Sequence, residues 1–153
     1  MKRKTIFLTA IFALLTFVSF SNQANAQEFA VGSTLENFTM KDTNGAEQSF
    51  DKLKGSKGTV VVFLSAQCPV VKGYNARINQ IAADYAAKGI SFIGINSNST
   101  ESLDWVKSDA AEVGYKFPVL IDKGNVLADK LGATVTPEAY FFDKKNVLVY
   151  HGA

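Results

Sequence analysis

Cys68 is the only cysteine in this chain of 153 residues, and it stands where a predicted strand gives way to a predicted helix. The strand is the apolar run over residues 60–64, and Pro69 follows Cys68 directly. Because proline is preset for the first helical position, the sulfur should lie at a helix N-terminus. The N–H groups and the dipole there favour an anion. The pattern therefore predicts a thiol biased toward thiolate, the form that attacks disulfides and peroxides.

The N-terminus has the pattern of a secretory signal peptide. Lys2-Arg3-Lys4 precedes a mostly apolar stretch over residues 6–20, and Ala24-Asn25-Ala26 supplies small residues for cleavage. This predicts a signal peptide over residues 1–26 and a single mature domain over residues 27–153. A membrane anchor is the alternative, but the apolar stretch is shorter than the ~20 residues that a spanning helix needs. We expect an exported protein, periplasmic or secreted, without a stable membrane anchor.

Export limits the states that a single cysteine can adopt. An oxidising compartment normally pairs cysteines, and a lone cysteine cannot form an internal disulfide. Cys68 is then reactive or engaged in an intermolecular disulfide, unless it serves as a small buried hydrophobe. The formal net charge of +2 includes the three basic residues of the signal peptide, so the mature domain is close to neutral. Nothing in this composition indicates a nucleic-acid partner.

The first half of the mature chain predicts a hairpin followed by a βαβ unit. Asn44-Gly45 lies between two short β-type runs, which is a hairpin signal. The unbroken apolar run 60–64 is typical of a strand covered on both faces. Apolar residues spaced by three and four predict a helix after Cys68 that is capped by Gly89. Residues 90–95 then form a second, parallel strand.

The second half continues the α/β pattern. A helix is expected to start at Ser99 or Thr100, with Glu101 in its first turn, and to end near Gly114. Three further segments complete the unit: an extended segment over 117–121, a small helix over 126–131, and a terminal hairpin with strands 139–142 and 147–150.

In order and spacing, these segments resemble the redoxin branch of the thioredoxin superfamily. That branch includes thiol-disulfide oxidoreductases and the peroxiredoxin-like alkyl hydroperoxide reductase/thiol-specific antioxidant proteins. The similarity covers nearly the whole mature chain and rests mainly on Phe63 to Pro69, Gly94-Ile95-Asn96, Phe117 to Leu120 and Thr136-Pro137. It implies a thioredoxin-like α/β fold, with a central mixed β-sheet flanked by helices and an N-terminal β-hairpin.

The resemblance also implies roles for individual residues. Cys68 corresponds to the nucleophilic cysteine, and Pro137 to the cis-proline whose loop faces it. Thr136 corresponds to the residue whose backbone pairs with a bound polypeptide. Lys72, four residues after Cys68, is a candidate for adding positive charge near the sulfur, although a solvated surface lysine is the alternative.

The chain departs from both patterns of its relatives. Three positions after Cys68 the thioredoxin pattern has a second cysteine, but this chain has Val71, so an external thiol must resolve any intermediate. Ser65 matches the Ser or Thr of the peroxiredoxin pattern, whereas Val61 replaces its proline and no arginine follows Arg77. Strong activation of peroxides is therefore not expected, because the missing cation would help hold thiolate and peroxide together.

No cofactor or metal is expected. Copper chaperones of this fold need two cysteines and a histidine, and only Cys68 and His151 are present here, which is short of the three or four ligands of a stable site. Family members usually continue past the last strand with a helix packed on the same sheet face as the Cys68 helix. Because the chain stops at Gly152-Ala153, part of an apolar face should lie open.

The sequence thus predicts an exported thiol oxidoreductase that acts through Cys68. Its partners would be protein or small-molecule thiols and disulfides, with peroxides as a further candidate oxidant and an external thiol as reductant. The alternative is a binding or chaperone module that keeps the thioredoxin-like fold without turnover.

Overall fold

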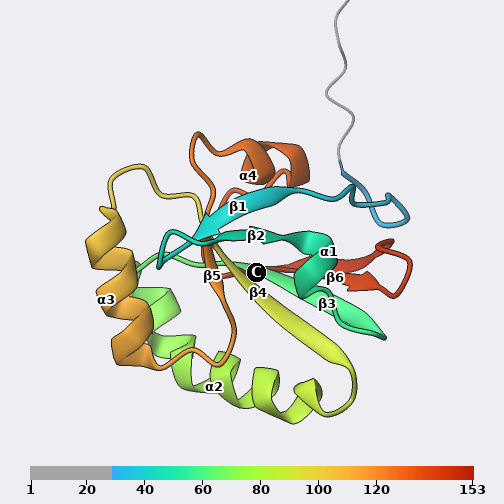
Figure 1. The fold of residues 1–153 in the computed structure, drawn as a ribbon, viewed down its shortest axis with the longest axis horizontal. Coiled ribbons are helices and arrows are strands. Elements are labelled where there is room, and N and C mark those ends of the chain that lie inside the picture. Colours follow the sequence, from blue (N-terminus) through green and yellow to red (C-terminus); the bar gives the residue numbers. More distant parts are fainter. Residues whose placement is uncertain (1–28) are drawn as a thin grey trace, which may run out of the picture.

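The computed structural model describes residues 29–153, so the predicted signal peptide lies outside the described residues. In chain order the elements are β1 (Thr39–Asp42), β2 (Glu47–Ser49), α1 (Phe50–Leu53), β3 (Gly58–Phe63), α2 (Pro69–Ala86), β4 (Ile90–Asn96), α3 (Leu103–Val113), β5 (Val119–Ile121), α4 (Val126–Leu131), β6 (Glu138–Asp143) and β7 (Leu148–Gly152). They build one seven-stranded sheet flanked by helices, shown in Figure 1.

The sheet is mixed, with strand order β2-β1-β5-β4-β3-β6-β7. The interior strand β3 pairs in parallel with β4 and antiparallel with β6, and β4 pairs in parallel with β5. Two antiparallel hairpins, β1–β2 and β6–β7, form the two edges. Because neighbours and helices enclose β3, five of its six residues are buried. The predicted thioredoxin-like α/β fold is confirmed.

Each face of the sheet carries its own apolar core. The larger core combines residues of β3, β4 and β6 with Phe50 of α1 and with Leu127 and Leu131 of α4. The smaller core lies on the opposite face, where Val62 and Leu64 pack against Val71 of α2 and against Cys68. Apolar packing therefore holds Cys68 against the end of the sheet.

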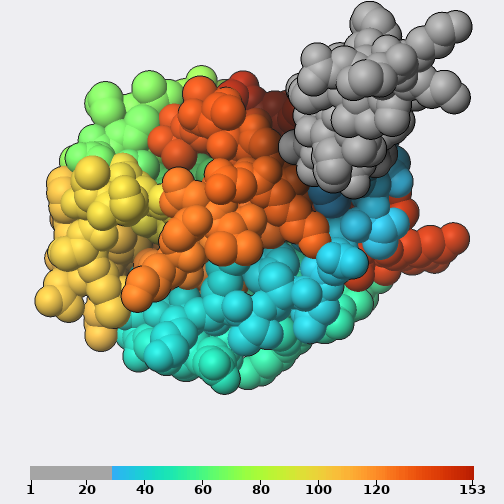
Figure 2. Space-filling model, turned by 90° about the horizontal axis from the view of Figure 1, so that it is seen from above, coloured from blue at the N-terminus to red at the C-terminus, as the bar shows by residue number. Residues whose placement is uncertain are grey.

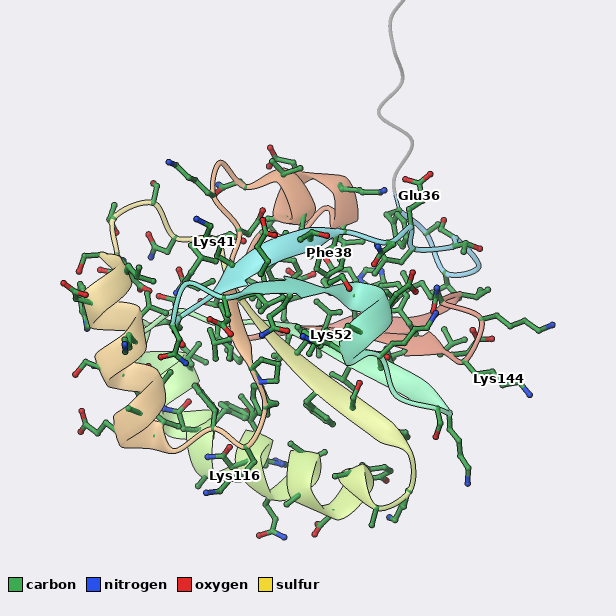
Figure 3. All side chains as sticks on the ribbon, viewed as in Figure 1. Glu36, Phe38, Lys41, Lys52, Lys116 and Lys144 are labelled. Atoms are coloured by element: carbon green, nitrogen blue, oxygen red, sulfur yellow. The ribbon has the colours of Figure 1, made fainter. Side chains whose placement is uncertain are left out.

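The N-terminal segment and α4 lie side by side on the larger-core face. Figure 2 shows α4 and its flanking loops in orange beside the blue segment that leads into β1. An ion pair of 2.7 Å joins Lys130 of α4 to Glu36, which Figure 3 places at the outside of the fold. Because both side chains are exposed, this pair contributes little to stability.

Helix α2 starts where the sequence predicts, whereas α3 does not. Ser102 caps α3, and its Oγ accepts the N–H of Trp105 at 3.2 Å, so the helix begins at Leu103 and not at Ser99 or Thr100. The reason is local: Oδ1 of Asn98 accepts the N–H and the hydroxyl of Thr100 at 3.1 and 2.8 Å. Such side-chain bonds compete with helix formation. Glu101 consequently precedes the helix, and its side chain binds the loop that follows β3.

The predicted open apolar face is present beside α2. Tyr74, Ile81 and Tyr85 continue the helix-spaced stripe that begins at the buried Val71, but they are 39–47% exposed. Tyr74 and Ile81 border a groove of about 630 Å³ between α2 and the strands β6 and β7, and Pro137 and Tyr150 also line it. Among residues 29–153, no helix is long and apolar enough to cross a membrane.

Removing a buried ring should cost far more stability than trimming an exposed side chain. Phe142 is 0% exposed, and its ring centroid lies 6.1 Å from that of Phe50. We expect Phe142→Ala to lower the free energy of unfolding by ~3–5 kcal/mol in denaturant titrations, because a cavity replaces the ring. The matched control is Val126→Ala at a position that is 68% exposed, with an effect within about 0.5 kcal/mol. Equal losses would contradict the described core.

Candidate functional site

Cys68 is the N-cap residue of α2, as the sequence predicts, with Pro69 in the first turn. Its carbonyl accepts the N–H of Lys72 at 3.1 Å, which is the first bond of the helix, and its own N–H donates to the carbonyl of Ser65 at 3.3 Å. The residue is partly exposed, so the sulfur is held in place and still accessible. The dipole of the 18-residue helix points its positive end at this position.

The loop that faces the sulfur comes from the far end of the chain. Because β3 and β6 are antiparallel neighbours with Phe63 opposite Glu138, the residues after β3 and those before β6 meet at one edge of the sheet. Sγ of Cys68 donates to the carbonyl oxygen of Thr136 at 3.3 Å. The peptide bond between Thr136 and Pro137 is cis.

The surroundings of Cys68 favour the thiolate. The side chain of Thr136, followed by the backbone N–H of Val71, lowers the pKa of the thiol below its ordinary value. Burial and the negative charge of Glu101 act in the opposite direction but are outweighed. Hydrogen bonds donated to the sulfur stabilise its charged form, whereas the bond that the thiol donates to the Thr136 carbonyl stabilises the neutral form. Deprotonated sulfur is the nucleophile of thiol chemistry, so this site is suited to attack on disulfides.

Glu101 organises the loop between β3 and Cys68. Its carboxylate accepts the hydroxyl of Ser65 at 2.6 Å and the backbone N–H groups of Ala66 and Gln67, each at 3.0 Å. Nδ2 of Asn96 donates to the same carboxylate at 2.6 Å. Burial opposes ionisation of Glu101, but these bonds outweigh it and hold the pKa of its carboxyl group below the ordinary value. A charged Glu101 thus shapes the three residues that precede the thiol.

Ser65 and Lys72 lie near Cys68 in the chain but face other partners. The Ser65 side chain is buried and donates its hydroxyl to Glu101. Its link to the thiol is therefore indirect, through the loop that Glu101 binds. Lys72 is exposed on α2. Burial raises the pKa of Asp109, and the positive charge of Lys72 opposes this rise. Direct roles for these two residues stay predictions.

Glu101 was not predicted as a site residue, because the sequence pattern indicated a position in the first turn of a helix. A signal was available: the parallel strands β3 and β4 end at the same edge of the sheet, so polar residues after each strand should meet. The run from Asn96 to Glu101 follows β4, and Ser65 follows β3.

Two hollows of different chemistry flank Thr136. The open groove beside α2 lies on one side and is lined mainly by apolar side chains. A smaller hollow of about 240 Å³ lies on the other side, with Ser65, Asn98, Asn125 and Thr134 among its polar lining. Within residues 29–153, no group of three or more His, Cys, Asp and Glu side chains is arranged to hold a metal ion. The candidate site consists of protein groups around one sulfur.

The sequence profile of the AhpC/TSA family matches residues 31–151, almost all of the chain that the structure describes. The protein belongs to the AhpC/TSA family. The redoxin resemblance inferred from the sequence is therefore confirmed.

Relatives within and around the AhpC/TSA family support the same architecture. The thiol-disulfide oxidoreductase ResA of Bacillus anthracis is 28% identical over 126 residues, which cover 82% of this chain and 71% of that one. An uncharacterized conserved protein from Geobacillus kaustophilus has a similar structure, with a TM-score of 0.78 and 32% identity over 83% of this chain and 70% of its own. A disulfide oxidoreductase of Mycobacterium tuberculosis, homologous to DsbE of E. coli, shares the fold with a TM-score of 0.66 and 20% identity over 75% of this chain and 81% of its own.

Removing the Thr136 hydroxyl should raise the pKa of Cys68. Hydrogen bonds to charged groups contribute ~1.5–3 kcal/mol, so we expect Thr136→Val to move the midpoint of iodoacetamide alkylation up by about one pH unit. Thr136→Ser keeps a hydroxyl and is the matched control, with a midpoint close to that of the wild type. An unchanged midpoint in Thr136→Val would show that the hydroxyl does not stabilise the thiolate.

Glu101 should make stability depend on pH in the acid range. Because the folded-state pKa of Glu101 is lowered, its contribution to stability is present above the unfolded-state pKa and is lost as pH falls through the folded-state pKa. The difference in unfolding free energy between the wild type and Glu101→Gln should therefore shrink as pH falls below about 4.5, measured by denaturant titration. Glu47→Gln, at an exposed position of β2, is the control and should show no such trend. A difference that stays constant with pH would exclude this linkage.

Proposed function

We propose that this protein is an exported thiol-disulfide oxidoreductase that uses Cys68 as its single nucleophile. The observation that carries the proposal is the sulfur at the N-terminus of α2, facing Thr136 with a lowered pKa. Membership in the AhpC/TSA family and similarity to ResA, a thiol-disulfide oxidoreductase, support it. Export as a periplasmic or secreted domain over residues 27–153 is part of the proposal and rests on the signal pattern of residues 1–26.

The reaction requires two exchanges. In the first, the Cys68 thiolate attacks one sulfur of a substrate disulfide, so a mixed disulfide forms and the other sulfur leaves as a thiolate. In the second, the thiolate of an external thiol attacks this mixed disulfide and releases Cys68. An external thiol is required because Cys68 is the only cysteine in the chain.

Thr136 has two functions in this scheme. In the neutral state the thiol donates to the Thr136 carbonyl, so that acceptor is occupied. Deprotonation removes the donor and leaves the carbonyl available to the backbone of an extended substrate. The Thr136–Pro137 segment then binds the polypeptide by β-type pairing, with the substrate sulfur beside Cys68. Ser65 acts through Glu101, and Lys72 adds a more distant positive charge.

Disulfides should be better oxidants than peroxides. Arg77 is the last arginine of the chain, and it lines the groove beside α2. A peroxide-activating cation positioned by a later strand is therefore missing. Attack on hydrogen peroxide would leave Cys68 as a sulfenic acid and release water. One external thiol would then form a mixed disulfide with Cys68 and release a second water, and a second external thiol would release Cys68 as the external disulfide forms.

The open groove supports a second candidate function. A binding or chaperone module would use the exposed apolar side chains of Val70, Tyr74 and Ile81 beside Thr136 to hold partners without turnover. Exposed apolar patches of this kind mark interaction sites. The two candidates differ in whether Cys68 reacts.

Adduct formation by the reduced protein separates the candidates. We expect oxidised glutathione to produce a single glutathione adduct on Cys68, detected by intact mass, more rapidly than hydrogen peroxide produces a sulfenic acid. Added thiol should restore the original mass, because the adduct is a mixed disulfide. Cys68→Ser is the control and should remain unmodified.

Faster oxidation by peroxide than by oxidised glutathione would reverse the order of the oxidants and make peroxide reduction the main activity. An unreactive Cys68 in the folded protein would favour the binding module.

A further inference from the structure

We propose that Glu138 is a positioning residue that holds Thr136 against Cys68. This inference rests on the proposed function, because it concerns the geometry of the same sulfur. Glu138 is the first residue of β6 and follows Pro137 directly. It is only 8% exposed, in line with Tyr140 and Phe142 on the core-facing side of the strand.

A carboxylate is costly at such a core-facing position unless hydrogen bonds satisfy it. Oε2 of Glu138 accepts the backbone N–H groups of Thr134 and Val135 at 3.0 and 3.4 Å. These two residues are exposed and immediately precede Thr136. The side chain of Glu138 therefore turns back along the chain and binds the loop that carries Thr136.

The other carboxylate oxygen is anchored in the core. Oε1 of Glu138 accepts the hydroxyl of Tyr140 at 2.9 Å, and the Tyr140 ring packs edge-on against Phe63 with centroids 5.7 Å apart. Burial, followed by the bond to Glu138, raises the pKa of Tyr140, so it remains a donor. His151 also faces this oxygen, with Nδ1 4.0 Å away and its ring stacked on Tyr140. Glu138 thus links a rigid sheet position to an exposed loop.

Thr136 connects the loop that Glu138 binds to the sulfur of Cys68. Thr136 follows the two bound N–H groups, its carbonyl lies 3.3 Å from Sγ, and its side chain is the main group that lowers the pKa of Cys68. Release of the loop has two opposing effects: loss of the bond from the thiol to the Thr136 carbonyl lowers the pKa, because that bond favours the neutral thiol, whereas loss of the Thr136 side chain raises it. The side chain is the largest effect on the pKa of Cys68, so we expect a net rise. Loss of the negative charge of Glu138 by itself would change the pKa in the opposite direction, because a nearby anion disfavours a thiolate. The sign of the change therefore separates positioning from charge.

The test measures iodoacetamide alkylation of Cys68 against pH in the full mature domain. We expect Glu138→Gln to raise the midpoint by about half a pH unit, part of the effect of losing the Thr136 bond itself. Asp143→Asn is the matched control. Asp143 lies at the other end of β6 and also accepts two backbone N–H groups, those of Lys145 and Val147, but in the turn before β7. The midpoint of Cys68 alkylation in Asp143→Asn should equal that of the wild type.

A double-mutant cycle tests whether Glu138 acts through Thr136. In a Thr136→Val background, Glu138→Gln should produce no further rise, because the Thr136 hydroxyl is already absent and only the backbone carbonyl remains beside the sulfur. A rise that persists in full there, a lowered midpoint in Glu138→Gln, or an equal rise in Asp143→Asn would overturn the proposal. The alkylation midpoint does not depend on turnover, so failure here is distinct from failure of the proposed oxidoreductase activity.

Hydrogen exchange of the wild-type protein gives a second test that needs no variant to fold. The amides of Thr134 and Val135 should be protected although both residues are exposed, because each donates to Glu138. Exchange of both amides at the rate of an unstructured chain would overturn the proposal.

Discussion

The contact between Cys68 and Thr136 is the interaction on which the rest of the site depends. It joins two segments that are 68 positions apart, and it exists because β3 and β6 are antiparallel neighbours in the interior of the sheet. The strand pairing brings the two loops to one edge of the sheet. Two buried or half-buried carboxylates then bind backbone N–H groups in them: Glu101 on the Cys68 side and Glu138 on the Thr136 side. The sulfur thus lies between two loops of defined shape.

The electrostatics of the site balance opposing effects. A charged Glu101 orders the loop before Cys68, yet its negative charge raises the pKa of the thiol. The Thr136 side chain and the N–H groups of α2 outweigh that effect. A nucleophile needs a thiolate, but its reactivity falls as its pKa falls. The negative charge of Glu101 therefore opposes the lowering of the Cys68 pKa but does not reverse it.

The parts of the fold that depend on local pattern could be predicted from the sequence. Pro69 after an apolar run predicted the N-cap position of Cys68, and Asn44-Gly45 predicted the first hairpin. The start of α3 could not be predicted in this way, since the Asn98 side chain decides it through bonds to Thr100. Glu138 was not recognised because its importance lies in a backward turn of one side chain, and neither spacing nor composition reports that. The pairing of Cys68 with Pro137 came from the family resemblance and not from periodicity.

A pH titration of thiolate absorbance tests the central claim, a Cys68 thiolate stabilised by the folded structure, most directly. The reduced protein is titrated once in the folded state and once unfolded in denaturant, and Cys68 is the only thiol that contributes. The account predicts a midpoint for the folded protein that lies below that of the unfolded chain, because Thr136 and the N-terminus of α2 act only in the folded state. A folded-state midpoint equal to or above the unfolded one would contradict it.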